Sequence, residues 1–193
     1  MRVVPLLSEP ELLAGCLAQN PRAQRQLYER FAPKLLAVAR RYVRDADDAE
    51  DVLAQAFVNV FRYLPQFQGT GALTGWIRRI VVHEALKFLR KKHAFTVSLD
   101  AESERGAPLS ERLGTAPAVE SDLAAADLWR LLAGLPVGYR TVFNLYAVEG
   151  FTHPQIAELL GISEGTSKSQ LSRARHTLQR QIAALNRAPA LAA

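Results

Sequence analysis

The sequence is poor in cysteine. Cys16 is its single cysteine among 193 residues, so no disulfide can form within the chain, and no Cys/His cluster has the spacing of a zinc site. A lone cysteine of this kind is best explained as a small buried apolar residue in a protein of a reducing compartment. We therefore expect neither a metal nor a cofactor.

Long apolar runs and strand-like patterns are also missing. No stretch approaches the ~20 apolar residues of a membrane span, and the N-terminus lacks the apolar segment of a signal peptide, so we expect a cytoplasmic protein without membrane insertion. Runs of alternating valine, threonine and tyrosine are absent, whereas aliphatic residues recur at helical spacing. The sequence predicts an all-α protein.

Charge is distributed unevenly, although it sums to only +5. Between Trp76 and His93 six Lys or Arg accompany one acid, Glu84, and between Thr166 and Arg187 five Lys or Arg accompany none. Residues 94–122 carry six acids against two arginines, with few large apolar residues. This predicts two small helical domains, 1–93 and 121–187, joined by a flexible acidic linker at 94–120 and followed by a tail at 188–193.

The segment 151–175 has the pattern of two helices joined by a glycine turn. Thr152 and Gln155 can form a capping box, and Gly161 can end the first helix in a left-handed conformation. Ser163 can cap a second helix, whose expected inward face is Ser167, Leu171, Ala174 and Leu178. This is the pattern of a helix-turn-helix, whose second helix enters the major groove. Bundles that bind no DNA share it, and the basic, acid-free outer surface is what favours DNA.

The second helix of this motif supplies the candidate DNA-reading residues. With Leu171 as the centre of the inward face, a step of about 100° per residue turns five side chains toward base edges: Thr166, Ser169, Ser172, Arg173 and His176. Three others fall on the flanks, where phosphate is nearer: Lys168, Gln170 and Arg175. Arg173 is the best candidate for a bidentate contact to guanine.

The N-terminal half has further amphipathic patterns. Helices are predicted from Ser8 to about 18, from about 21 to 43, and from Asp45 onward, and Pro33 should kink or break the second. A glycine-rich loop, 65–75, precedes a fourth helix with basic residues outward. A basic helix beside aromatic residues suits single-stranded nucleic acid, while the alternative is a solvated face over an aromatic core. The candidate residues are Trp76, Arg78, Arg79, His83, Lys87 and Arg90.

One enzyme-like pattern occurs in this fourth helix. His83 and Glu84, followed by Lys87, differ by one residue from the HExxH motif of zinc proteases. The second histidine of that motif is a metal ligand, and a lysine there offers a cation instead of a lone pair. We predict no zinc site and no enzymatic activity.

Together these residues resemble the sigma factors of bacterial RNA polymerase, specifically the small two-domain extracytoplasmic-function (ECF) group. The C-terminal part, LPVGYRTVFNLYAVEGFTHPQIAELLGISEGTSKSQLSRAR, is similar to the family's promoter-reading helix-turn-helix. The N-terminal part adds the DAED helix at residues 48–51, the FQGTGAL-GW loop and the W-I-R-R-I helix. Their order and separation make the resemblance more specific than either pattern alone.

The resemblance implies a sigma factor that binds core RNA polymerase and directs promoter-specific transcription initiation in a stress or envelope response. The N-terminal domain would dock on the polymerase and capture the melted minus-ten element, and the C-terminal domain would read the minus-thirty-five element of promoter DNA. The acidic linker would run toward the RNA exit path. The polymerase-binding residues would be Asp48, Asp51, Gln55 and Asn59. An anti-sigma factor is a further candidate partner.

Some residues depart from the family pattern: Ala54, Gln55, His83, Lys87, Ser167 and Gln170. They imply a less acidic polymerase-facing surface and altered promoter preferences. The main alternative is a stand-alone helix-turn-helix regulator with a helical sensor domain, which would bind its operator without polymerase, usually as a dimer.

Overall fold

The structure, a computed structural model, describes residues 6–92 and 125–187. Within these ranges every regular element is helical and no β-strand occurs, which confirms the all-α class. The chain divides into two compact units, Met1–Lys91 and Lys92–Ala193. The linker predicted at 94–120, the Ser121 cap and the tail at 188–193 lie outside the described residues.

None of the helices in residues 6–92 and 125–187 is long and apolar enough to cross a membrane.

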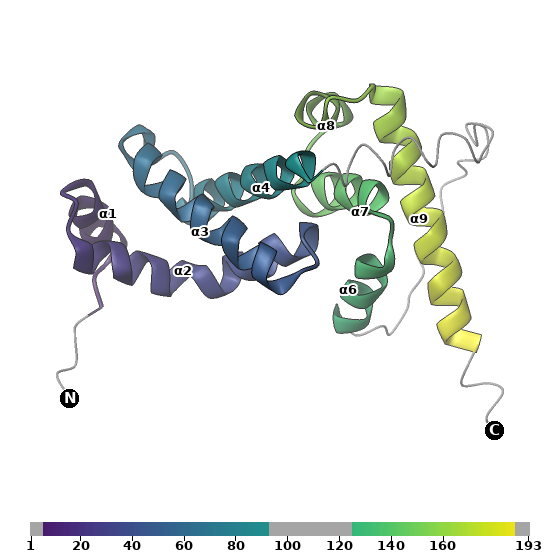
Figure 1. The fold of residues 1–193 in the computed structure, drawn as a ribbon, viewed down its shortest axis with the longest axis horizontal. Helices are drawn as coiled ribbons and strands as arrows, with labels where there is room; N and C mark the ends of the chain where they lie inside the picture. The colour runs from purple at the N-terminus through teal and green to yellow at the C-terminus, as the bar shows by residue number, and fades with distance from the viewer. Residues whose placement is uncertain (1–5, 93–124, 188–193) are drawn as a thin grey trace. The chain divides into compact units, whose positions relative to one another are not determined.

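The first unit begins with three helices (Figure 1), and a local side chain caps the N-terminus of each. These are α1 (Glu9–Leu17), α2 (Pro21–Tyr42) and α3 (Ala46–Tyr63). The side chains of Ser8, Asn20 and Asp45 each accept a hydrogen bond from a backbone N–H of the first helical turn. A 3-10 turn, η1 (Leu64–Gln66), and helix α4 (Leu73–Lys91) complete the unit.

Two boundaries differ from the prediction. Helix α2 is continuous through Pro33, because Phe31, Ala32 and Leu35 on either side are buried and their packing offsets the roughly 3 kcal/mol cost of an internal proline. Helix α4 begins at Leu73 rather than after Gly75. Leu73 is fully buried, so core packing extends the helix into what looked like loop.

The core of the first unit lies among α2, α3 and α4, which pack on one another, while α1 packs on α2. Its fully buried side chains include Leu27, Tyr42, Val60 and Ile77. The α1–α2 contact depends on Gly15, since a Cβ there would lie only 2.6 Å from Cβ of Ala23. This three-helix core fixes which faces of α3 and α4 remain accessible.

The second unit contains α6 (Ala125–Gly134), α7 (Val137–Phe143), η2 (Asn144–Val148), α8 (His153–Leu160) and α9 (Glu164–Arg187). Pro136 separates α6 from α7, as expected. Helix α7 continues directly into the π-helical turn η2 rather than into further α-helix. Helix α9 runs from the turn after α8 past α7 to α6 and contacts all three (Figure 1). Part of the core of the second unit consists of Leu132, Leu135, Ala174 and Leu178.

Buried Arg140 ties α7 to the end of α6. Its Nη1 donates to the carbonyl oxygens of Leu135 at 3.3 Å and Ala133 at 3.4 Å. Carbonyls at a helix C-terminus have no partner within the helix, so the arginine satisfies them and fixes the approach of α7.

The helix-turn-helix has the predicted local chemistry. The backbone N–H of Thr152 donates to Gln155 Oε1 at 2.9 Å, which is half of the capping box at the start of α8. Gly161 ends α8 with φ of 67°, and Ser163 Oγ accepts from the N–H of Thr166 at 3.0 Å at the start of α9. The turn between α8 and α9 is therefore determined by residues within it.

Gly161→Ala should destabilise the second unit by about 1–2 kcal/mol, because a Cβ is strained in the left-handed region. No atom lies within 4 Å of the added Cβ, so the backbone angle is the whole cause. The matched control is Gly165→Ala, where the Cβ meets only Ser163 Oγ at an ordinary 3.7 Å. Urea unfolding of both variants checks this, and equal effects would show that the turn conformation is not the constraint.

Candidate nucleic-acid interface

The buried side of α9 is wider than the sequence indicated. Ser167, Leu171, Ala174 and Leu178 are buried as predicted, but Gln170 is buried as well, at 3% exposure. Gln170 lies beside Gly138 of α7, where a Cβ would be 3.3 Å from its Oε1. The missing side chain at Gly138 makes room for the glutamine, so the prediction that Gln170 contacts DNA from the flank is wrong.

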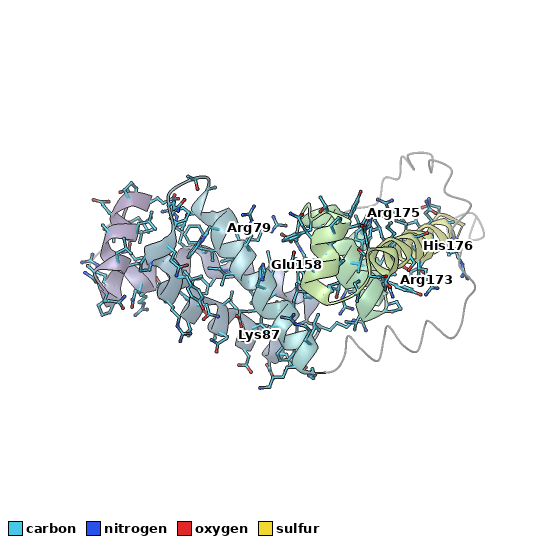
Figure 2. All side chains as sticks on the ribbon, turned by 90° about the horizontal axis from the view of Figure 1, so that it is seen from above. Arg79, Lys87, Glu158, Arg173, Arg175 and His176 are labelled. Carbon is cyan, nitrogen blue, oxygen red and sulfur yellow. The ribbon has the colours of Figure 1, made fainter. Side chains whose placement is uncertain are left out.

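Including Gln170 shifts the centre of the inward face by about 50° from Leu171. The outward pole of α9 then lies near Ser169 and His176, which are both exposed. Arg173 is half-buried at the border of the buried arc instead of at the pole. Figure 2 shows Arg173 and Arg175 leaving α9 on different sides, as residues about 200° apart should.

The hydroxyl groups at the start of α9 are partly engaged by the helix itself. Ser169 Oγ donates to the carbonyl oxygen of Thr166 at 3.0 Å, and Thr166 Oγ1 lies 2.8 Å from Ser163 Oγ. A serine hydroxyl that donates inward presents lone pairs outward. Ser169 can therefore accept from an exocyclic amine of adenine or cytosine in the major groove.

Lys168 is not an isolated positive charge. Its Nζ lies 2.6 Å from Glu164 Oε1, one turn earlier on α9. This hydrogen bond, together with the lysine charge, lowers the pKa of Glu164. The acid-free stretch that begins at Thr166 is thus preceded by Glu164, whose carboxylate already pairs with Lys168. Arg175 is exposed and stands over an aromatic ring instead, as described below.

Buried Ser167 has a polar partner on the first helix of the motif. His153 Nδ1 lies 2.9 Å from Ser167 Oγ, which links the first residue of α8 to α9. Burial lowers the pKa of His153, the charges of Lys168 and Arg175 lower it further, and Glu164 opposes them. The imidazole is therefore neutral at pH 7. The sequence analysis did not select His153.

Five of the six candidate residues on α4 share one face. Steps of about 100° place Trp76, Arg79, His83, Lys87 and Arg90 within roughly 80° of one another. Arg79, His83, Lys87 and Arg90 are exposed. Arg78 instead points toward the side of α4 that carries Ile77 and Val81 and is half-buried, so it does not belong to this face. Figure 2 shows Arg79 and Lys87 on α4.

The α4 face combines aromatic and cationic groups. Trp76 packs against Phe67 of the preceding loop, with ring centroids 5.4 Å apart and a tilt of 49°. Trp76 is half-buried and does not belong to the fully buried core, so the alternative of an aromatic core does not describe this residue. The pKa of His83 is lowered, first by partial desolvation and then by Arg90 and Arg79, with Glu84 opposing.

The four candidate polymerase-binding residues of α3 do not form one surface. Asp51 and Gln55 are exposed, Asp48 is half-buried and Asn59 is only 7% exposed. Asn59 lies about 80° around the helix from Asp51, and its Nδ2 donates to Glu84 Oε1 of α4 at 2.8 Å. Asn59 thus links α3 to α4 through a hydrogen bond. Its burial contradicts the prediction that it contacts the polymerase.

The exposed stripe of α3 includes an apolar residue that the sequence analysis missed. Val58 is 51% exposed and lies on the same side as Asp51 and Ala54. The signal available in the sequence was an apolar residue, Val58, that falls outside the regular apolar stripe of this helix.

The zinc-like segment is occupied by internal pairing. Glu84, which accepts from Asn59, also lies 3.6 Å from Lys87 Nζ. In the part of the chain that the structure describes, no group of three or more His, Cys, Asp or Glu is placed to hold a metal ion.

Comparison with known families assigns both units. Residues 27–95 match the family model for Sigma-70 region 2, and residues 125–178 match the model for Sigma-70 region 4. The first match covers α3 and α4, and the second covers the helix-turn-helix.

Individual relatives agree over nearly the whole chain. The ECF RNA polymerase sigma factor SigM of Mycobacterium tuberculosis is 32% identical over 93% of this chain and 87% of its own length. The ECF RNA polymerase sigma-E factor of Escherichia coli is 27% identical over 94% of this chain and 97% of its own. A solved structure of the sigma factor RpoE with the anti-sigma factor NepR from Bartonella quintana is 26% identical over 81% of this chain and 94% of that one, with a TM-score of 0.48. The chain belongs to the ECF family of RNA polymerase sigma factors, as the sequence predicted, and it directs transcription initiation.

Proposed function

We propose that the two units divide promoter recognition between them. Residues 1–93 dock on core polymerase and capture the melted minus-ten element, residues 121–187 read the minus-thirty-five element, and residues 94–120 link them. The observation that carries this proposal is that each family match falls almost entirely on one unit, and each unit presents one helix with a cationic outer face, α4 or α9. The protein then acts in the cytoplasm, and no covalent chemistry is part of its function.

Polymerase docking is assigned to the exposed stripe of α3. Its polar part is Asp51 and Gln55, and Ala54 and Val58 continue it as an apolar surface. Acids in the first turns of a helix are favoured by the helix dipole, so Asp51 combines local stability with a negative charge available to a basic partner. Asp48 contributes at the edge of this stripe.

Capture of the minus-ten element is assigned to the outer face of α4. Single-stranded DNA is bound where bases stack on aromatic rings and phosphates meet cations. The Phe67–Trp76 pair supplies the rings, and Arg79, Lys87 and Arg90 supply the cations. His83, with its lowered pKa, adds a neutral hydrogen-bonding group.

Reading of the minus-thirty-five element is assigned to α9. Ser169, Ser172, His176 and the border residues Thr166 and Arg173 face base edges, while Lys168 and Arg175 flank them. Because phosphate contacts position a protein and base contacts specify the sequence, these two sets should respond differently to substitution.

The stand-alone regulator is not favoured, because its helix-turn-helix would not require a sigma region 2 in the same chain. An anti-sigma factor, such as the one bound to RpoE in the Bartonella complex, is a candidate partner that would control access to these surfaces.

The purified chain, added to core RNA polymerase, should start transcription at a defined promoter that core polymerase alone does not use. In vitro transcription with template DNA carrying the promoter of the chain's own operon measures this. Binding to that promoter with equal strength in the absence of polymerase would instead support the stand-alone regulator.

Asp51→Lys should weaken binding to core polymerase by roughly tenfold, since it places like charges at the contact, with little change in thermal stability. Glu50→Lys is the control for charge reversal, because Glu50 is exposed on the same helix about 100° away and its 3.7 Å ion pair with Arg40 of α2 is itself exposed, so losing that pair costs little stability. Asn59→Ala should do the reverse and lose about 1–3 kcal/mol of stability, because Glu84 loses its donor. Calorimetry and polymerase pull-down distinguish them. Equal loss of binding from Glu50→Lys would reject the proposed stripe.

Arg173→Ala should relax sequence preference at one position of the upstream element, where a bidentate guanine contact is worth about 1–3 kcal/mol. Arg175→Ala should weaken promoter binding for all sequences and reduce the salt slope by about one unit. Lys168→Ala should do so less, because Glu164 already holds its ammonium group. Holoenzyme binding to a set of single-base promoter variants tests this. Indifference to all three substitutions would mean that α9 does not read the element.

A further inference from the structure

We infer that Tyr146 is a positioning residue for promoter binding: its ring, supported by His153, holds the guanidinium of Arg175 for a DNA phosphate. This inference rests on the proposed reading of the upstream element by α9, and it concerns a residue of the π-turn η2, outside both helices of the helix-turn-helix.

Three side chains from three elements form a continuous stack. The guanidinium carbon of Arg175 in α9 lies 5.7 Å from the centroid of the Tyr146 ring in η2. The other neighbour of that ring is His153 of α8, whose centroid lies 4.7 Å away at an interplanar angle of 24°. A cation within about 6 Å of a tyrosine face is attracted by the ring quadrupole. Arg175 is therefore drawn to a defined place beside α9.

The stack is anchored at its inner end by a buried hydrogen bond. His153 Nδ1 lies 2.9 Å from Ser167 Oγ, and Ser167 is 0% exposed. The hydroxyl occupies an inward position of α9, and an aliphatic side chain at that position could make no such bond. Because this hydrogen bond fixes the imidazole, it also fixes the ring against which Tyr146 stacks.

The charges around His153 suit this role. Arg175 and Lys168 of α9 repel a protonated imidazole, and Glu164 of α9 only partly compensates. The neutral ring therefore supports Tyr146 without bringing a second cation against the guanidinium.

The backbone of η2 places Tyr146 where this contact is possible. If α7 continued as an α-helix, each residue would turn the chain by about 100°. A π turn has one more residue in each hydrogen-bonded turn than an α-helix, so the side chains of η2 point in different directions from those of a continued α-helix. Leu145 remains buried while Tyr146 is 37% exposed. The ring can thus touch both α8 and the exposed flank of α9.

Such a stack should help binding by ordering a long side chain before DNA arrives. A free arginine gives up rotamer freedom when it meets a phosphate, and pre-organisation removes part of that cost. Tyr146 then affects promoter binding only through Arg175. That dependence is what separates positioning from a general effect on the fold.

The test is a double-mutant cycle in the complete holoenzyme. The full chain carries Tyr146→Leu, Arg175→Ala or both, and the probe is a duplex containing the promoter at which wild-type holoenzyme initiates, across a range of salt concentrations. Tyr146→Leu alone should weaken binding by about two- to fivefold, as expected for an exposed cation–π contact, and should have no effect once Arg175 is alanine. Tyr146→Phe, which keeps the ring, should bind like wild type.

Arg180→Ala provides the matched background, because Arg180 is an exposed arginine of the same helix. Tyr146→Leu should retain its full effect there. Equal effects of Tyr146→Leu in the Arg175→Ala and wild-type backgrounds would overturn the inference while leaving the proposed function intact. If Arg175→Ala alone changed neither affinity nor salt slope, Arg175 would have no phosphate contact, and its place in the proposed function would fall as well.

A second measurement does not depend on any substitution. In the NMR spectrum of the wild-type chain, the side-chain protons of Arg175 should be shifted upfield by the Tyr146 ring, relative to those of Arg180. Equal shifts for the two arginines would overturn the inference even if Tyr146→Leu failed to fold.

Discussion

The packing of α9 against α7 and α8 is the constraint on which the proposed upstream interface depends. Once Ser167, Gln170, Leu171, Ala174 and Leu178 are buried, the direction of every other side chain on that helix follows from its 3.6-residue period. Adding one residue, Gln170, to the buried set moves Arg173 from the outward pole of the helix to the border of its buried arc. If α9 reads the promoter as proposed, the residues buried on its core side therefore control the sequence specificity.

Internal ion pairs modify the cationic faces that this packing exposes. Glu164 holds Lys168 on α9, and Glu84 holds Lys87 on α4 while also joining Asn59 of α3. The exposed Glu164–Lys168 pair adds little stability, but in both pairs the carboxylate would compete with DNA phosphate for its lysine. The number of basic residues on a face therefore overstates the charge available to DNA. The Glu84 pairings also connect the proposed polymerase-facing helix with the proposed strand-capturing helix.

Two polar residues at inward positions of α9, Ser167 and Gln170, are buried against neighbouring helices. Ser167 and Gln170 were identified from the sequence as departures from the usual pattern, and each is buried beside a specific neighbour. Ser167 meets His153, and Gln170 fits against Gly138. A buried polar group is costly without a partner, so the bond to His153 explains how a serine is accommodated where an apolar side chain is usual. These contacts link α9 to α8 and α7.

The sequence alone determined the class, the starts of α1, α2, α3 and α9, the turn of the helix-turn-helix and the family. These features depend on residues close together in the chain: Ser8, Asn20, Asp45 and Ser163 cap helices, Gly161 supplies the left-handed turn, and Pro136 separates two helices. Only the tertiary structure decided which candidate side chains are accessible. Gln170, Asn59 and Arg78 have polar side chains at positions that a periodicity argument leaves near a boundary, and contacts with Gly138, with Glu84 and with the core side of α4 decided their burial. The π turn that brings Tyr146 to His153 and Arg175 is likewise set by packing between helices, because no local residue pattern distinguishes it from a continued α-helix.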